Sequence, residues 1–347
     1  MVNIESLVRK NIRELKPYST ARDEFVGEAS VFLDANENPY NAPYNRYPDP
    51  MQRELKRAIA AQKNVAAAQM LLGNGSDEPI DLLIRAFCEP KLDNIVAIAP
   101  TYGMYKVAAD VNNVEYRKVQ LNAQLDFCAD DLLRAADERT KLIWLCSPNN
   151  PTGNSLNRQE IVRTIEAFAG IVVLDEAYID FSERQTFLSE LRRYPNLVVL
   201  QTFSKAWASA GVRLGMAFAA TEIIDVLNKI KYPYNINVLT LHHALRHILQ
   251  RGDDVKAWVK TLLAEREKLR SALTALPCVL RVFPSDANFL LVKTTDANAI
   301  YRHLTSKGVV VRNRHNVELC ENCLRITAGT PQENAALVKA MSELRFT

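Results

Sequence analysis

Two cations stand eight residues apart in the segment QTFSKAWASAGVRLG, where Lys205 and Arg213 lie among small and apolar neighbours. An amine in such surroundings can form an imine with a carbonyl carbon. A guanidinium can bind a phosphate or carboxylate through two parallel hydrogen bonds. Small residues between the two cations let the backbone come close to a ligand. Taken alone, however, a lysine is usually a solvated surface charge, so the segment does not by itself establish such a site.

Other strand-like apolar runs also end in polar residues. One run leads into Asn150 of NNPTG, the next into Asp175 and Tyr178 of DEAY, and an earlier run leads into GNGSDE at 73–78, before an apolar helix. Each segment alone is equally an ordinary turn, helix cap or surface charge. Ligands of open α/β sheets bind outside the carboxyl ends of the strands, so these residues are expected to meet. A lysine, a carboxylate, polar donors and a glycine-rich helix start together suit pyridoxal phosphate.

The elements that must position these residues follow from periodicity. Short strand-like runs lie at 95–98, 114–119, 142–145, 171–174, 197–200 and 214–219, mostly with helical patterns between them, and all of them except 114–119 are uncharged. This alternation predicts a mostly parallel sheet sandwiched by helices, which is an α/β fold. A helical region of about forty residues, ending at Leu276, and then shorter strands and helices predict a smaller α+β domain. We expect an N-terminal arm over 1–34 that forms part of the small domain, a large domain over 35–235 and a small domain over 236–347.

Composition excludes several other classes. The 347 residues exceed the roughly 250 to 300 at which a single core stops growing, so two domains are expected. The net charge of +3 indicates no nucleic-acid partner, and no apolar run approaches the roughly 18 residues of a membrane span. A charged start predicts a cytoplasmic protein with reduced cysteines. Cys320 and Cys323 form a C-x-x-C without a second pair, and His242, His243 and His247 lack metal-ligand spacing, so no metal site is expected.

The motifs, taken in order, resemble a known family, the fold-type I pyridoxal-phosphate-dependent aminotransferases. The resemblance covers nearly the whole chain. It rests on PYS, LDANE, RYP, GNGSDEPIDLLIRAFCEP, PTYGMYKV, CSPNNPTG, VVLDEAYIDF, TFSKAWASAGVRLG and CLRITAG. More narrowly, the N-terminal arm and the PTYGMY and CLRIT segments are similar to those of the histidinol-phosphate aminotransferase family.

This resemblance implies roles at the cofactor. Lys205 would form the imine with pyridoxal phosphate and then carry the α-proton of the substrate, and Asp175 would pair with the ring nitrogen. Asn150 and Tyr178 would donate to the ring oxygen, and Arg213 would bind the phosphate. The further contacts that it implies are Ser204, Thr202 and the backbone of Gly75, Ser76 and Asp77 at the phosphate, Tyr102 stacked on the ring, and Tyr47 at the phosphate in a neighbouring subunit. The last of these implies a homodimer.

The resemblance also implies a substrate shell. Arg325 of CLRIT would hold the carboxylate of glutamate as a bidentate fork. Histidinol phosphate carries a phosphate and no carboxylate, so the same arginine would serve both half-reactions. Arg312, Tyr18 and Asn288 would complete the shell, whereas no motif assigns a role to Arg314.

The implied reaction is a ping-pong amino transfer between L-histidinol phosphate and 2-oxoglutarate, which gives imidazole acetol phosphate and L-glutamate in histidine biosynthesis. Two alternatives of the same fold stay open, an aromatic amino-acid aminotransferase and a threonine-phosphate decarboxylase. A third alternative, from another class, is a non-catalytic or nicotinamide-binding α/β protein. In that case Lys205 would be a surface charge and the protein would be colourless.

Overall fold

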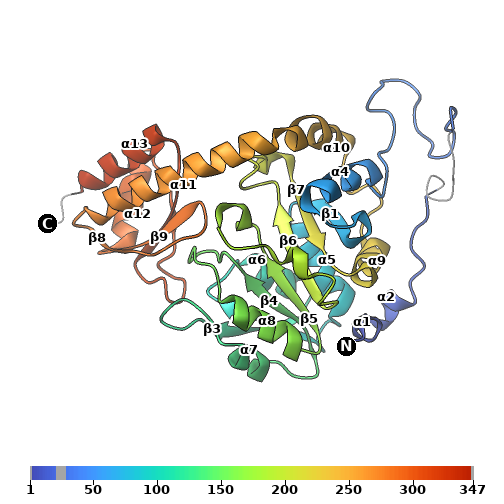
Figure 1. The fold of residues 1–347 in the computed structure, drawn as a ribbon, viewed down its shortest axis with the longest axis horizontal. Helices are drawn as coiled ribbons and strands as arrows, with labels where there is room; N and C mark the ends of the chain where they lie inside the picture. Colours follow the sequence, from blue (N-terminus) through green and yellow to red (C-terminus); the bar gives the residue numbers. More distant parts are fainter. Residues whose placement is uncertain (1, 21–28, 345–347) are drawn as a thin grey trace.

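A seven-stranded sheet forms the centre of the computed structural model, which describes residues 2–20 and 29–344 (Figure 1). Its strands are β1 (Met70–Asn74), β2 (Asn94–Ala99), β3 (Glu115–Gln120), β4 (Thr140–Cys146), β5 (Ile171–Asp175), β6 (Leu197–Thr202) and β7 (Leu214–Phe218). The strand order is β1-β7-β6-β5-β4-β2-β3. Only β7 runs antiparallel to its neighbours within this sheet. The predicted mostly parallel sheet is therefore confirmed.

Helices cover both faces of this sheet. They are α4 (Arg53–Lys63), α5 (Asp77–Phe87), α6 (Met104–Val111), α7 (Ala129–Ala135), α8 (Arg158–Ala167) and α9 (Thr221–Ile230). Side chains alternate along each strand, so Leu142 and Trp144 of β4 face one core cluster and Ile143 and Leu145 face the other. Helices α5, α6 and α9 contribute to the first of these clusters, and α4, α7 and α8 to the second. Burial on both faces explains why the interior strands are almost free of charge, whereas the edge strand β3, with Glu115, Arg117 and Lys118, is largely exposed.

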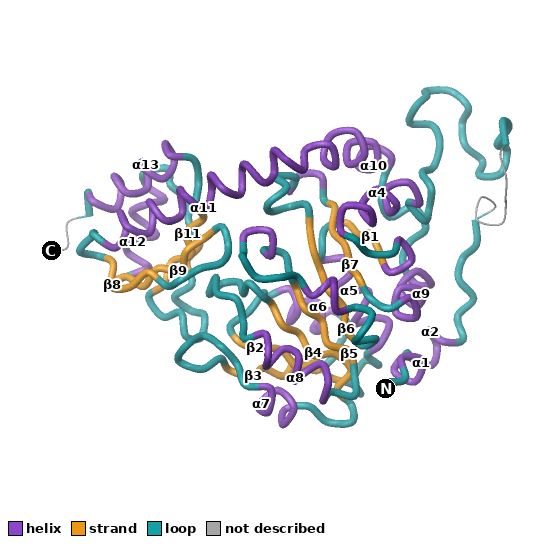
Figure 2. Tube along the Cα trace, viewed as in Figure 1, coloured by secondary structure: helices purple, strands orange, loops and turns teal. Residues whose placement is uncertain are grey.

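A second, four-stranded sheet belongs to the C-terminal part of the chain (Figure 2). Its strands are β8 (Val279–Val282), β9 (Phe289–Thr294), β10 (Arg312–Asn313) and β11 (Cys323–Thr327), in the order β10-β11-β9-β8 and all antiparallel. Three helices pack on it through a separate core cluster: α11 (Gly252–Thr274), α12 (Ala297–Ser306) and α13 (Pro331–Ser342). Strands β10 and β11 bring the C-terminal arginines to the edge of the large sheet.

The predicted forty-residue helical region is interrupted. Helix α10 (Val238–His243) continues into a π-helical turn at Ala244–Ile248 and a 3-10 turn at Leu249–Arg251 before α11 begins at Gly252. Glycine is a poor helix former, so a helix break at this point agrees with the local sequence. Leu241 and Ile248 pack into the core of the large sheet, and α11 then extends to the small sheet (Figure 1). The domain boundary at residue 235 stays a prediction, and this packing favours one nearer to α11.

The N-terminal segment packs against the large part of the molecule. Helices α1 (Ile4–Leu7) and α2 (Lys10–Arg13) lie beside α9, and Ile4 joins the core cluster of α5 and α9. After α2, residues 14–20 and then 29–52 lie as extended segments on the side away from the small sheet (Figure 2). Within residues 2–20 and 29–344, no helix has both the length and the apolar content to cross a bilayer.

Candidate active site

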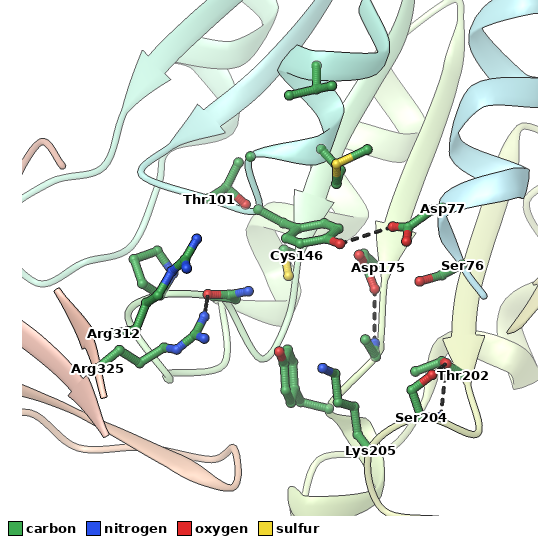
Figure 3. Close-up of a pocket in the computed structure, with 18 of the residues that line it drawn as sticks. Ser76, Asp77, Thr101, Cys146, Asp175, Thr202, Ser204, Lys205, Arg312 and Arg325 are labelled. Carbon is green, nitrogen blue, oxygen red and sulfur yellow. Dashed lines mark hydrogen bonds between the residues drawn. The ribbon is translucent and has the colours of Figure 1, made fainter. Parts of the chain in front are cut away.

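A cavity of about 610 Å³ opens where the carboxyl ends of β4, β5 and β6 meet the start of α5. Strands β10 and β11 of the small sheet close one side of it (Figure 3). Its lining contains Ser76, Asp77, Tyr102, Asn150, Asp175, Tyr178, Thr202, Ser204, Lys205, Arg213, Arg312 and Arg325, which are residues that the sequence predicted, together with Thr101, Gly103, Met104, Val107, Cys146, Pro151, Ala177, Arg314 and Val317. Residues from seven separate segments therefore converge on one cavity.

The loop between β6 and β7 positions both cations of QTFSKAWASAGVRLG. The two strands are antiparallel neighbours, with Thr202 opposite Gly215, so the loop must return to the edge that it left. The backbone N–H of Phe203 donates to the carbonyl of Leu214 at 3.1 Å and closes the loop. Arg213 has a φ of 56°, a left-handed conformation that costs free energy in residues other than glycine and is concentrated at functional sites. Lys205 and Arg213 thus line the same cavity.

The amine of Lys205 is held in surroundings that favour its neutral form. Its Nζ lies 5.5 Å from the ring centroid of Tyr178. Burial of the ammonium, followed by the positive charge of Arg325, lowers the pKa of Lys205. A lowered pKa raises the fraction of free amine near neutral pH, which is the form that attacks a carbonyl carbon.

Asp175 ends β5 at the floor of the cavity and is only 2% exposed. The hydroxyl of Tyr105 donates to Oδ2 at 2.7 Å, and the backbone N–H of Ala177 donates to Oδ1 at 3.0 Å. Burial nevertheless dominates and raises the pKa of Asp175. Among the described residues, Asp175 has these two neutral donors and forms no ion pair, so a cationic ligand group would stabilise its charged form.

Asn150 and Arg325 link the two sheets across the cavity. Nη1 of Arg325 donates to Oδ1 of Asn150 at 2.6 Å, although 175 residues separate them. Arg325 also lies 5.3 Å from the ring centroid of Phe289, which packs edge-on against Tyr178. Because the bond uses the amide oxygen of Asn150, its N–H₂ group remains the donor on that side chain.

The start of α5 forms the end of the cavity opposite to Arg312 and Arg325 (Figure 3). Ser76 and Asp77 precede and begin the helix, and backbone N–H groups at such an end attract anions. The Asp77 carboxylate accepts from the hydroxyl of Tyr102 at 3.0 Å and from Nη2 of Arg213 at 3.3 Å. Thr202 donates to the hydroxyl of Ser204 at 3.0 Å nearby. This end therefore gathers the helix start, Arg213 and two hydroxyls.

Four predicted site residues stand apart from the side chains that line the cavity. Tyr18 is 76% exposed on the arm, and Tyr47 is 50% exposed and stacks on Tyr234 with centroids 4.4 Å apart. Asn288 lies outside the lining, in the loop before β9. Gly75 is also outside the lining, and it lies close to Arg213, since a Cβ on Gly75 would meet the guanidinium at 2.3 Å. The roles assigned to these residues stay predictions.

Comparison with known proteins agrees with this geometry. The family model for aminotransferase class I and II matches residues 30–341. The chain belongs to the class I and II aminotransferases. It is 60% identical over 344 residues to the histidinol-phosphate aminotransferase of Bacteroides fragilis, with 99% of both chains covered, and 59% identical over the whole of both chains to that of Parabacteroides distasonis. The histidinol-phosphate aminotransferase of Sinorhizobium meliloti, solved in complex with pyridoxal-5'-phosphate, has the same fold, with a TM-score of 0.78 at 23% identity over 89% of each chain.

Sequence reasoning missed two residues that matter in this aminotransferase. Tyr105 is fully buried, holds Asp175 and stacks on Trp144 with centroids 4.8 Å apart. Its place in the PTYGMY segment, three residues after Tyr102, was the available signal, although Tyr102 precedes α6 and Tyr105 lies in its first turn. Arg314 lines the cavity beside Arg325, and only the pairing of β10 with β11 reveals this.

Gly215 permits the close approach of β7 to the segment before α5, so replacing it should weaken the fold of this aminotransferase. A Cβ at Gly215 would lie 2.2 Å from the carbonyl carbon of Gly75 and 2.3 Å from the nitrogen of Ser76. Because these are backbone atoms, we expect Gly215→Ala to lower the free energy of unfolding by about 1–3 kcal/mol. Gly211→Ala is the matched control, since nothing lies within 4 Å there. Urea unfolding of both variants measures the difference, and equal stabilities would contradict it.

Proposed function

We propose that this aminotransferase uses pyridoxal phosphate to move an amino group between L-histidinol phosphate and 2-oxoglutarate. The products are imidazole acetol phosphate and L-glutamate, and the reaction belongs to histidine biosynthesis. The observation that supports this proposal most directly is that Lys205 and Asp175, from neighbouring strand ends, line one cavity with a cluster of arginines at its far side. The names of relatives at 59–60% identity over essentially the full length support the choice of substrate.

The described residues fit pyridoxal phosphate. The buried carboxylate of Asp175 can accept the N–H of a protonated ring nitrogen, and the backbone of Gly75 and Ser76 with Arg213 can hold a phosphate. When bound, pyridoxal phosphate supplies an aldehyde carbon for the amine and an electron-poor ring that accepts the electron pair left when the α-proton departs. Every other part of the chemistry falls to side chains of this protein.

Lys205 carries out the proton transfer. Its Nζ would hold the cofactor through the aldehyde carbon, and as a free amine it would be available as a base beside the substrate. The lowered pKa of Lys205 then favours the neutral amine, which takes a proton from the α-carbon and returns it at another carbon. The carboxylate of Asp175 would accept the N–H of the protonated ring nitrogen and so keep the ring in its electron-poor form. Tyr105 keeps the carboxylate oriented at 2.7 Å.

Asn150, Tyr178 and Arg325 orient the reacting groups. The Asn150 amide oxygen is engaged by Arg325, so its N–H₂ group and the Tyr178 hydroxyl are the donors for the ring oxygen. Burial raises the pKa of Tyr178, which keeps its hydroxyl protonated and able to donate. Arg325 still has further N–H donors with which to hold the carboxylate of glutamate.

A homodimer in the cytoplasm completes the proposal. The arm presents Tyr40, Tyr44 and Tyr47, which are 79%, 58% and 50% exposed in the single chain. Aromatic side chains on an extended arm suit a subunit interface, and Tyr47 would then reach the phosphate site of the partner. All six cysteines are free, as suits a reducing compartment. The mass of the protein in solution tests the dimer.

Side-by-side turnover tests the substrate. Purified protein with pyridoxal phosphate is given histidinol phosphate, phenylalanine or threonine phosphate, each with 2-oxoglutarate, while glutamate and released CO₂ are measured. We expect the highest kcat/KM for glutamate formation with histidinol phosphate. Preference for phenylalanine would indicate an aromatic aminotransferase, and CO₂ from threonine phosphate would indicate the decarboxylase. A colourless protein with no visible band that borohydride removes would refute the cofactor itself.

A further inference from the structure

Three arginines form one wall of the cavity. Arg312 lies on β10 opposite Arg325 of β11, and Arg314 follows two residues later (Figure 3 shows Arg312 and Arg325). The backbone N–H of Arg314 donates to the carbonyl of Cys323 at 2.9 Å, which extends the pairing of the two strands by one step. Residues two apart on a strand point to the same side, so Arg312 and Arg314 both reach the cavity.

No carboxylate neutralises this wall within the part of the chain that the structure describes. None of the three arginines forms an ion pair there, although many exposed arginines of the chain do. Arg325 instead donates a hydrogen bond to Asn150, whose side chain is a neutral amide. Arg314 and Arg325 are partly buried and Arg312 is exposed. A bound anion would stabilise these guanidinium groups, because they face one cavity without a carboxylate partner among the described residues.

Arg314 is the least satisfied of the three. Its Nε is buried and has no hydrogen-bond partner, whereas most buried polar atoms in proteins have one. Burial, then the charges of Arg325 and Arg312, lower the pKa of Arg314 to about 10. An ordinary structural arginine would instead bond a carboxylate or backbone carbonyl. The guanidinium of Arg314 is therefore available to donate hydrogen bonds to a ligand.

The charge of the ligand can be inferred from the number of arginines. A carboxylate has one negative charge and is held by a single bidentate guanidinium, which Arg325 provides. A phosphate monoester carries close to two charges at neutral pH and three acceptor oxygens, so it can engage further guanidinium groups. The same wall must accept both anions if one cavity serves both half-reactions. Arg314 is then the group that only the phosphorylated substrate needs.

We propose that Arg314 is a specificity-determining residue that binds the phosphate of the phosphorylated amine donor and does not contact the carboxylate of glutamate. This rests on the proposed function, because it names the substrate group that the third arginine recognises. It goes beyond the motif-based assignment, which gave Arg325 and Arg312 to the substrate and left Arg314 without a role.

Single-turnover half-reactions test this assignment. Holoenzyme of the wild type, Arg314→Gln and Arg314→Lys is mixed with histidinol phosphate, histidinol or glutamate, and the change of the visible band is followed. For Arg314→Gln we expect kcat/KM with histidinol phosphate to fall about 10- to 100-fold, as for a lost charged hydrogen bond, and with glutamate to change less than about threefold. The rate with histidinol, which lacks the phosphate, should hardly change. Arg314→Lys should recover part of the loss.

Two further measurements separate binding from structure. Inorganic phosphate should compete less well against histidinol phosphate in Arg314→Gln than in the wild type. The midpoint of thermal unfolding of the variant should not fall, because the substitution removes a charge without a partner. Arg302→Gln, an exposed arginine of α12 outside the cavity, is the control and should match the wild type.

The outcomes are distinguishable from failure of the proposed function. A wild type that turns over no histidinol phosphate refutes the proposed function. If the wild type turns over histidinol phosphate, the role of Arg314 is refuted by either of two results. Arg314→Gln slows the reactions with glutamate and with histidinol phosphate equally, or it slows neither of them.

Discussion

Replacing Lys205 with alanine is expected to abolish amino transfer, with kcat falling about 10²- to 10⁴-fold from the lost proton transfer alone. Lys205 lines the cavity, and its lowered pKa makes it the available base there. Without its amine, nothing bonds the aldehyde carbon at rest and nothing removes the α-proton. Steady-state formation of glutamate from histidinol phosphate and 2-oxoglutarate measures the loss. Borohydride treatment should leave a phosphopyridoxyl mass on Lys205 of the wild type and none on the variant.

A control separates catalysis from stability in this experiment. Lys260→Ala removes an exposed lysine of α11 outside the cavity, and it should keep both the activity and the visible band. Small primary amines added to Lys205→Ala should restore part of the rate, because they can carry the proton in place of the missing side chain. A Lys205→Ala protein that retains wild-type turnover would overturn the assignment of the base.

The second large effect is expected at Asp175. Asp175→Asn keeps the size of the side chain and an acceptor for the Tyr105 hydroxyl but removes the charge beside the ring nitrogen. We expect kcat to fall about 10²- to 10³-fold, comparable to the loss of one preorganised electrostatic partner of a transition state. Tyr105→Phe, which leaves the charge but loses the 2.7 Å hydrogen bond, should cost much less. Steady-state kinetics of the three proteins gives the ranking.

Although Asp175→Asn should lower activity, it should raise the stability of the protein from which the cofactor has been removed. Burial raises the pKa of Asp175 above the value of about 3.9 expected in the unfolded chain. The folded apoprotein then binds more protons than the unfolded chain, so its stability falls as the pH rises from about 4 through the folded pKa. An asparagine has no such dependence. At neutral pH the Asp175→Asn apoprotein should therefore be more stable, by about 0.5–2 kcal/mol.

Thermal unfolding of both apoproteins between pH 4 and 8 checks this sign. The gap between the variant and the wild type should widen with pH and then level off. A variant that is less stable at every pH would show that Asp175 is a structural residue, and its lost activity would then carry no information about catalysis.

Much of the fold and of the cofactor end of the site was predictable from local pattern. The runs 95–98, 142–145 and 171–174 are strands β2, β4 and β5, because an uncharged β-branched run is stable only when both faces are buried. Parallel neighbours end at one edge, so the residue after each strand joins the same site. Asp175 and Lys205 could be placed together on that basis.

Contacts between the two sheets could not be predicted in this way. The hydrogen bond from Arg325 to Asn150, and the place of Arg314 on the same wall, depend on how the small sheet packs over the large one. The buried neighbour of Asp175, Tyr105, depends on which face α6 turns inward.

Sequence alone determined the α/β fold, the polar residues that meet at the strand ends and the family, because strand periodicity and turn residues act over a few neighbouring positions. Tertiary structure alone decided that three arginines share one wall without a carboxylate among the described residues. The physical reason is that the groups packed against a charge decide whether it is exposed or compensated. For Arg325 the packed group is Asn150, which lies 175 residues away in the sequence.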